Sequence, residues 1–215
     1  PFKAKKLGAS LISKNIFIFI KKKFLNNPGC WKPLIYCWRG GQRSKALALI
    51  LSEIGWEVYL LKGGYKTYRK KINKSLNKII NNLRYIVLRG KTGTAKTKIL
   101  ETLLNKGGAV LNLEELAKHK GSLLGKYPNS NQPTQKFFES LIYFELKKFK
   151  KNKPIFIESE SSKIGNLYLP SALLNKIENS HCIDIESNLN ARVSFLLKDY
   201  SRYILKNNGF NELFL

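Results

Sequence analysis

Two short apolar segments of this chain each run into a glycine-containing loop and then into a segment with helical periodicity. The first is Leu34–Tyr36, followed by a loop at 37–44. The second is Tyr85–Leu88, followed by a loop at 89–97. Strand, glycine loop and helix in this order are typical of parallel α/β units, in which such loops lie at the carboxyl ends of the strands and bind ligands. The order therefore predicts an α/β fold with two candidate sites.

The remaining periodicity fits the same fold class. Apolar patterns predict further strands and helices, at 58–61, 109–111, 154–157 and 182–185 for strands and at 3–23, 44–54, 98–105 and 137–149 for helices. The composition becomes lysine- and asparagine-rich near 70–84. We therefore predict two domains, at 1–75 and 85–215, joined by a linker at 76–84.

Composition limits the class of protein. The 215 residues are 43% hydrophobic, enough for packed cores, and no apolar run approaches the ~20 residues of a membrane span. Three cysteines in a chain of this length argue for a reducing compartment, so we expect a cytoplasmic protein without a membrane partner. The net charge of +25 fits a nucleic-acid partner, but it equally fits a solvated lysine-rich surface.

The first loop places a cysteine where a helix begins. Two glycines and an arginine follow Cys37, and the backbone of such a loop directs successive N–H groups inward. These donors and the helix dipole stabilise a thiolate, the nucleophilic form of cysteine. We therefore predict Cys37 as the catalytic residue and the following loop as its anion cradle, formed by Arg39, Gly40, Gly41, Gln42, Arg43 and Ser44.

The spacing of Cys37 and Arg43 fits more than one chemistry. A rhodanese-type sulfurtransferase loop has this form, and so does the loop of a cysteine phosphatase. A buried cysteine before a glycine turn is the structural alternative.

The second loop matches all but one position of the Walker A pattern, G-x-x-x-x-G-K-[ST]. Gly90, Lys96 and Thr97 agree with it, whereas Ala95 stands in place of the last glycine. Backbone N–H groups, the lysine and the threonine of such a loop hold phosphate and Mg²⁺, although a methyl group at position 95 restricts the loop. The predicted phosphate-binding residues are Gly90, Lys91, Thr92, Gly93, Thr94, Ala95, Lys96 and Thr97.

Two acidic residues end the predicted strand at 154–157. Glu158 and Glu160 are placed to hold Mg²⁺ directly or through water, or they are solvated strand-end acids.

Taken together, these segments resemble bacterial tRNA 2-selenouridine synthases, which join a rhodanese domain to a P-loop domain. The similarity extends over most of the chain, in segments 4–9, 34–44, 60–69, 89–97, 113–122, 132–139 and 157–170. It implies an incomplete rhodanese-like parallel-sheet domain followed by a P-loop NTPase-like α/β domain. His119, Glu158 and Glu160 match family motifs and become supporting site residues without an assigned role.

The resemblance also implies a reaction. Family members replace the sulfur of 2-thiouridine at the tRNA wobble position by selenium. Selenophosphate is the donor, and a geranylated intermediate forms from geranyl diphosphate. The implied partners are tRNA and small phosphate-containing substrates, with Mg²⁺ as a candidate cofactor. No feature predicts the oligomeric state.

The chain departs from the family at both ends and at two positions. Ala95 replaces a glycine, and Asn112 stands where an aspartate is expected. The chain begins at Pro1 and contains no Met, which suggests a fragment whose activity is open. The alternatives are a rhodanese-type sulfurtransferase or cysteine-dependent phosphatase acting on small anions, or an inactive basic RNA-binding remnant.

Overall fold

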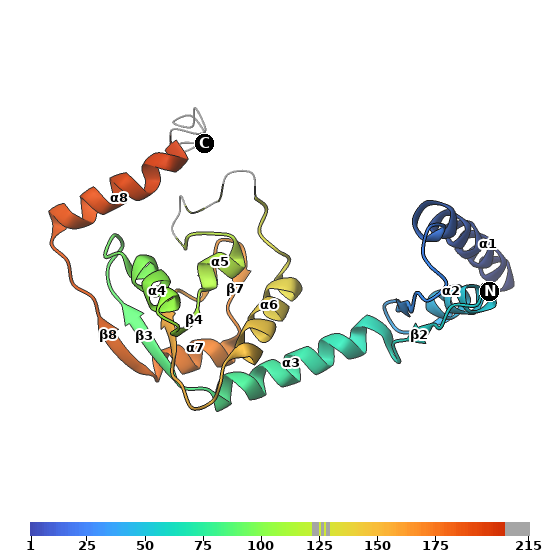
Figure 1. The fold of residues 1–215 in the computed structure, drawn as a ribbon, viewed down its shortest axis with the longest axis horizontal. Helices are drawn as coiled ribbons and strands as arrows, with labels where there is room; N and C mark the ends of the chain where they lie inside the picture. The colour runs from blue at the N-terminus through green and yellow to red at the C-terminus, as the bar shows by residue number, and fades with distance from the viewer. Residues whose placement is uncertain (122–124, 126, 128–129, 205–215) are drawn as a thin grey trace. The chain divides into compact units, whose positions relative to one another are not determined.

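The chain forms two compact units that divide after Lys71 (Figure 1). The structure is a computed structural model that describes residues 1–121, 125, 127 and 130–204. We call residues 1–71 unit 1 and the described residues from Ile72 onward unit 2. None of the described helices has the length and apolar character needed to cross a membrane.

Unit 1 contains one parallel strand pair and its surrounding helices. In chain order its elements are α1 (Phe2–Phe19), the π-helical turn η1 (Ile20–Phe24), β1 (Leu34–Ile35), α2 (Gln42–Glu53), β2 (Tyr59–Leu60) and the first part of α3 (Gly64–Asn82). β1 pairs with β2 in parallel, as expected for an α/β crossover through α2. The sequence thus placed the strand, loop and helix around Cys37 correctly.

The core of unit 1 is small. Ile35, Ala48 and Leu51 are buried, and the rings of Trp31 and Trp56 pack against them. The indole Nε1 of Trp56 donates a hydrogen bond to the carbonyl of Pro28 at 3.0 Å. Burial of these few side chains links the loop at 25–33 to the strand pair.

Unit 2 contains a four-stranded parallel sheet. Its elements after α3 are β3 (Tyr85–Arg89), α4 (Lys96–Asn105), β4 (Ala109–Leu111), α5 (Leu113–Ala117), α6 (Gln135–Lys148), β5 (Ile155–Glu158), β6 (Lys163–Ile164), β7 (Leu167–Tyr168), α7 (Ser171–Glu178), β8 (His181–Asp184) and α8 (Leu189–Ile204). The sheet order is β4-β5-β3-β8, and β6 and β7 form a separate antiparallel pair. The prediction of a parallel α/β fold is confirmed.

Side chains of β3 alternate between the two faces of this sheet. Val87 belongs to the larger core, with apolar residues of α3, α6 and α7, whereas Leu88 packs with Leu100 of α4. Successive strand residues point to opposite faces, so helices cover both sides of the sheet. All the parallel strands consequently direct their carboxyl ends toward one edge, where the loop at 90–97 lies.

Most of the lysine- and asparagine-rich segment is helical. Helix α3 includes most of the linker that we predicted at 76–84. Leu76 and Ile80 on this helix are buried in the larger core of unit 2, because apolar residues recur there at a spacing of four.

Candidate functional site

The thiol of Cys37 lies inside the first glycine loop. The backbone N–H of Gly41 donates to Cys37 Sγ at 3.1 Å, and Ser44 Oγ lies 3.2 Å from the same sulfur. Gly41 is the N-cap of α2, so the sulfur also lies at the positive end of the helix dipole. The loop therefore surrounds a side chain of its own with donors.

These contacts change the acidity of the thiol. The side chain of Ser44, together with backbone donors of Ser44, Gly41 and Arg39, lowers the pKa of Cys37 from 9.0 to about 6. A thiol with this pKa is mainly thiolate at neutral pH, and Cys37 is only partly buried. The arrangement can therefore supply an accessible nucleophile.

The predicted cradle residues differ in their contribution. Ser44 is buried and contacts the sulfur, and Gly40 has a φ of 66° that allows the sharp turn. The side chains of Arg39, Gln42 and Arg43 are exposed on the loop and the first turn of α2. The loop thus uses backbone and hydroxyl groups at the sulfur and presents its arginines to solvent.

The second loop folds around its own lysine. Lys96 Nζ donates to the carbonyl oxygen of Gly90 at 2.8 Å, and Thr94 Oγ1 donates to that of Lys91 at 2.9 Å. Gly90 must be small, because a Cβ added there would lie 2.6 Å from the carbonyl oxygen of Ile185. The spacing of the Walker A pattern thus corresponds to a closed loop at the start of α4.

Ala95 adopts the left-handed conformation that glycine would favour. Its φ is 59° and its ψ is 28°, and it forms the N-cap of α4. An L-residue in this region costs roughly 1–2 kcal/mol relative to its ordinary conformations. The alanine therefore leaves the course of the loop intact and adds strain to it.

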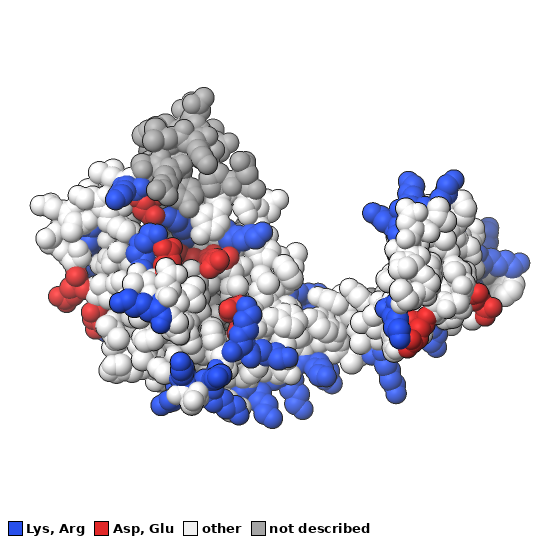
Figure 2. Space-filling model, in the orientation of Figure 1, with Lys and Arg blue, Asp and Glu red and all other residues white. Residues whose placement is uncertain are grey.

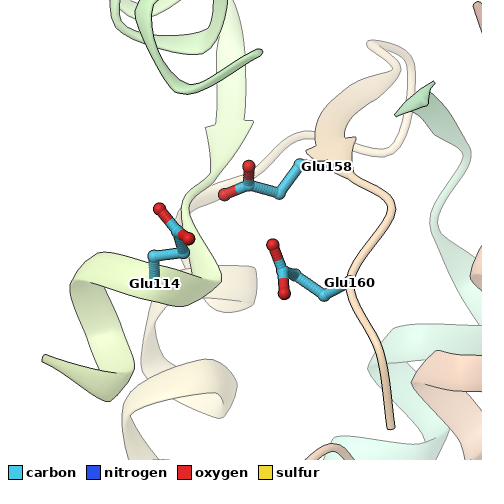
Figure 3. A group of neighbouring side chains, drawn as sticks. All are labelled: Glu114, Glu158 and Glu160. Carbon is cyan, nitrogen blue, oxygen red and sulfur yellow. The ribbon is translucent and has the colours of Figure 1, made fainter. Parts of the chain in front are cut away.

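Three carboxylates meet beside this loop. Glu114 comes from the start of α5, Glu158 from the end of β5, and Glu160 from the segment after β5 (Figure 3). Each contributes an oxygen to a group within 4.8 Å of one another. Thr97 Oγ1 makes long contacts with carboxylate oxygens of Glu114 (3.4 Å) and Glu158 (3.5 Å).

Burial and mutual repulsion keep protons on this cluster. Burial is the main cause that raises the pKa of Glu158 to about 8 and that of Glu160 to about 7, and the negative charge of Glu114 adds to both shifts. Burial also raises the pKa of Glu114. Lys96 opposes these shifts, and Glu158 Oε1 is buried without a hydrogen-bond partner.

A cavity of about 1130 Å³ joins the loop to the carboxylates. Lys96, Thr97 and all three glutamates line it, together with Phe195 and Asp199 of α8. Asp199 forms an ion pair with Lys120 at 2.5 Å. The second candidate site is therefore an open cavity at the carboxyl edge of the sheet, lined by both charged and apolar residues.

Two further predicted positions differ in their relation to this cavity, which Asn112 lines and His119 does not. His119 is buried, its Nδ1 has no partner, and burial lowers its pKa, but it does not line the cavity. Asn112 accepts a hydrogen bond from the backbone N–H of Glu115 at 3.0 Å and caps α5, which asparagine does as well as aspartate. Ser122 and Pro128 lie outside the described residues.

The sequence prediction missed two residues of the second site. Glu114 follows β4, and strand order could have placed it beside Glu158. Arg192 of α8 donates from Nε to the carbonyl oxygen of Thr92 at 2.9 Å, bringing a cation to the loop. No local pattern in the sequence indicates that contact, because the two residues are far apart along the chain.

Basic side chains outnumber acidic ones on the visible surface. Figure 2 shows more lysine and arginine than acidic side chains on the visible face of each unit. The sequence of residues 1–71 contains Glu53 and Glu57 as its only acidic residues, and Lys32 forms an ion pair with Glu57. Unit 1 is therefore strongly cationic, which favours binding of polyanions.

Comparisons with known proteins identify the family of the chain. Residues 82–211 match the profile of a family described as "tRNA 2-selenouridine synthase AAA domain". A protein from Alcanivorax borkumensis named tRNA 2-selenouridine synthase is 39% identical over 168 residues, which are 77% of this chain and 45% of that protein. One of the same name from Marinobacter nauticus is 33% identical over 204 residues, which are 92% of this chain and 53% of that protein.

The matches also show what share of each relative's length this chain covers. A third relative of the same name, from Nitrosomonas eutropha, is 34% identical over 172 residues, or 79% of this chain and 44% of that protein. The chain thus spans about half the length of these curated relatives. No solved structure matches it significantly.

Proposed function

Because the chain belongs to the tRNA 2-selenouridine synthase AAA-domain family, we propose that it takes part in replacing the sulfur of 2-thiouridine in tRNA by selenium. Selenophosphate is the proposed selenium donor. Geranyl diphosphate first alkylates the 2-thio sulfur and releases diphosphate. The selenium of selenophosphate then bonds to C2, and the geranylated sulfur leaves as geranylthiol after taking up a proton. Water cleaves the Se–P bond and releases phosphate, which leaves selenium at C2.

Unit 1 supplies the nucleophilic part of this proposal. We assign this unit to a rhodanese-like domain, and the parallel strand pair, the loop around Cys37 and helix α2 support the assignment. The thiolate of Cys37 is the proposed reactive group. The exposed arginines of its loop, Arg39 and Arg43, are placed to receive the phosphate oxygens of selenophosphate.

Unit 2 supplies the phosphate site. The closed loop at 90–97 and Lys96 lie at the start of α4, where backbone N–H groups and the helix dipole attract anions. The Lys96 amino group now contacts the carbonyl oxygen of Gly90 and can turn from it to a phosphate oxygen. We assign geranyl diphosphate to this cavity, because its apolar lining residues, among them Leu104 and Phe195, suit a hydrocarbon tail.

The carboxylates beside the loop fit Mg²⁺. Glu114, Glu158, Glu160 and the hydroxyl of Thr97 are oxygen ligands of the type that Mg²⁺ prefers. The unpartnered Oε1 of Glu158 is buried, and a cation would satisfy it. When bound, the ion would neutralise the oxygens of a diphosphate.

One observation carries the proposal within the chain: a cysteine held as a thiolate in a strand–loop–helix unit that belongs to the same chain as the matched AAA domain. The test incubates the purified 215-residue chain with 2-thiouridine tRNA, geranyl diphosphate, Mg²⁺ and ⁷⁵Se-labelled selenophosphate. Nucleoside analysis then measures ⁷⁵Se in 2-selenouridine.

We expect incorporation by the native chain and its loss in Cys37→Ser. Cys182→Ser is the matched control, because Cys182 belongs to β8 of unit 2 and not to the Cys37 loop, and it should retain incorporation. A folded native chain that transfers no selenium would refute the proposed activity. Equal incorporation by Cys37→Ser would refute only the role of the thiol, and not the activity.

A further inference from the structure

Four aromatic rings cluster at the loop that carries Cys37. Tyr36 and Trp38 flank the cysteine in the chain, and Tyr65 and Tyr68 come from the first turns of α3. The ring centroid of Tyr65 lies 5.4 Å from that of Trp38, 5.9 Å from that of Tyr68 and 6.5 Å from that of Tyr36. We call these four residues the aromatic surface.

The backbone fixes this surface relative to the thiol. The N–H groups of Tyr65 and Lys66 donate to the carbonyl oxygens of Cys37 and Trp38, both at 2.9 Å. This approach requires Gly64, because a Cβ added there would lie 2.2 Å from the carbonyl oxygen of Cys37. The start of α3, which carries Tyr65 and Tyr68, is therefore bonded directly to the backbone of Cys37 and Trp38.

These rings are not part of the core. The core of unit 1 uses Trp31, Trp56 and Phe24. By contrast, Tyr36 is 56% exposed and Trp38 is 46% exposed. A core role therefore does not explain why four aromatic residues gather at the loop.

Exposed cationic residues neighbour the aromatic residues in the chain. Arg39 follows Trp38, Lys66 follows Tyr65, and Lys62 precedes the turn into α3; all three side chains are exposed. Single-stranded nucleic acids are bound by this combination, in which bases stack on aromatic rings and basic side chains contact the phosphates. The scarcity of acidic residues in unit 1 favours the same partner.

We propose that the aromatic surface stacks unpaired bases of RNA and thereby positions one base beside the thiol of Cys37. This inference rests on the proposed function for the identity of the RNA, and it adds how the RNA is held. The RNA is single-stranded at the contact, because the bases of a duplex are already stacked and their faces are closed to the rings.

The test measures binding of the full 215-residue chain to a fluorescein-labelled tRNA anticodon stem-loop and to the matching fully paired duplex, by anisotropy at several salt concentrations. Trp38→Leu should weaken stem-loop binding by about tenfold, whereas Trp38→Phe should stay within about threefold of the native chain. Lys66→Gln should reduce the dependence on salt. Circular dichroism checks that each variant is folded.

Binding that depends only on charge would not distinguish Trp38→Leu from Trp38→Phe. Equal stem-loop affinity of Trp38→Leu and the native chain would overturn the inference, and so would equal binding of stem-loop and duplex. Self-association that Trp38→Leu abolishes without changing RNA affinity would also overturn it, because a second protein copy would then be the occupant.

The outcome is separable from that of the proposed function. Cys37→Ser should bind the stem-loop like the native chain, since stacking does not need the thiol. If the native chain binds through the rings but transfers no selenium, the proposed activity fails and the stacking surface stands. If selenium is transferred normally by Trp38→Leu and RNA affinity is also unchanged, the stacking surface fails and the activity stands.

Discussion

The loops after β1 and β3 have a similar backbone course, but a thiolate lies in the first and a lysine in the second. Both follow a parallel strand, contain glycines and begin a helix. In the first, N–H and hydroxyl groups surround a sulfur of the same loop and lower the pKa of Cys37 to about 6. In the second, Lys96 lies within the loop and three glutamates adjoin it.

The difference shows that the side chain at the centre of such a loop determines which ligands the loop needs. The first loop contains its own anion, the Cys37 thiolate, and needs no added ligand to form this nucleophile. The second presents a cation beside repelling carboxylates, so it needs a phosphate and a divalent cation from outside. The two sites are therefore expected to respond in opposite ways to pH and to ligands.

The largest expected effect concerns the lysine of the second loop. Lys96→Met should weaken binding of Mg²⁺–diphosphate by about 100-fold, because it removes charge-assisted hydrogen bonds to phosphate. Isothermal titration calorimetry measures the affinity. Lys106→Met, at the other end of α4, is the control and should bind normally. Equal affinity of the Lys96 and Lys106 variants would contradict the assignment.

The hydroxyl beside the sulfur is the next test. Ser44→Ala removes the main cause of the lowered thiol pKa, so the pKa of Cys37 should rise and its alkylation at pH 7 should slow by about tenfold. Iodoacetamide labelling followed by peptide mass analysis gives the rate. Ser52→Ala, an exposed serine near the end of the same helix, should leave the rate unchanged.

The two sites should also give opposite pH dependences of stability. Folding raises the pKa of Glu158 and Glu160, so their contribution is fully present below pH ~4.5 and is lost as pH rises through about 7 and 8. Folding lowers the pKa of Cys37, so its contribution is present above pH 9 and is lost as pH falls through about 6.

Urea unfolding in the Cys37→Ser background isolates the carboxylates. Without divalent cations, the free energy of unfolding should fall between pH 5 and 8.5, and Glu158→Gln should reduce that fall by on the order of 1 kcal/mol. Added Mg²⁺ should raise the free energy of unfolding of the parent again at pH 8.5. Glu178→Gln, an exposed acid at the end of α7, should behave like the parent. A pH-independent parent would refute the role of burial.

The smallest effect concerns backbone strain in the second loop. Ala95→Gly should raise the free energy of unfolding by about 0.5–1 kcal/mol, because glycine adopts the left-handed conformation without strain but loses more entropy on folding. Ala172→Gly, within α7, should instead destabilise the chain. A destabilising Ala95→Gly would show that the methyl group makes useful contacts.

Most of the elements and loops that were predicted from the sequence were recognised from patterns within a few neighbouring residues. Apolar runs located β3 and β5, and glycine with Lys96 located the second loop, because these signals lie within a few residues. Helix α8 and the contact of Arg192 with Thr92 were missed, since they depend on packing between distant segments. The role of Ser44 was only partly anticipated: its place in the cradle was predicted, but the dominance of its hydroxyl over the Arg43 side chain depends on how α2 begins.

The acidity of the Cys37 thiol tests the central claim most directly. Its alkylation rate should be measured against pH in a chain that carries Cys30→Ser and Cys182→Ser, so that one thiol remains. A midpoint near pH 6 is the result expected from the loop geometry. A midpoint near pH 9 would show that the loop does not hold a thiolate and would contradict the account of unit 1.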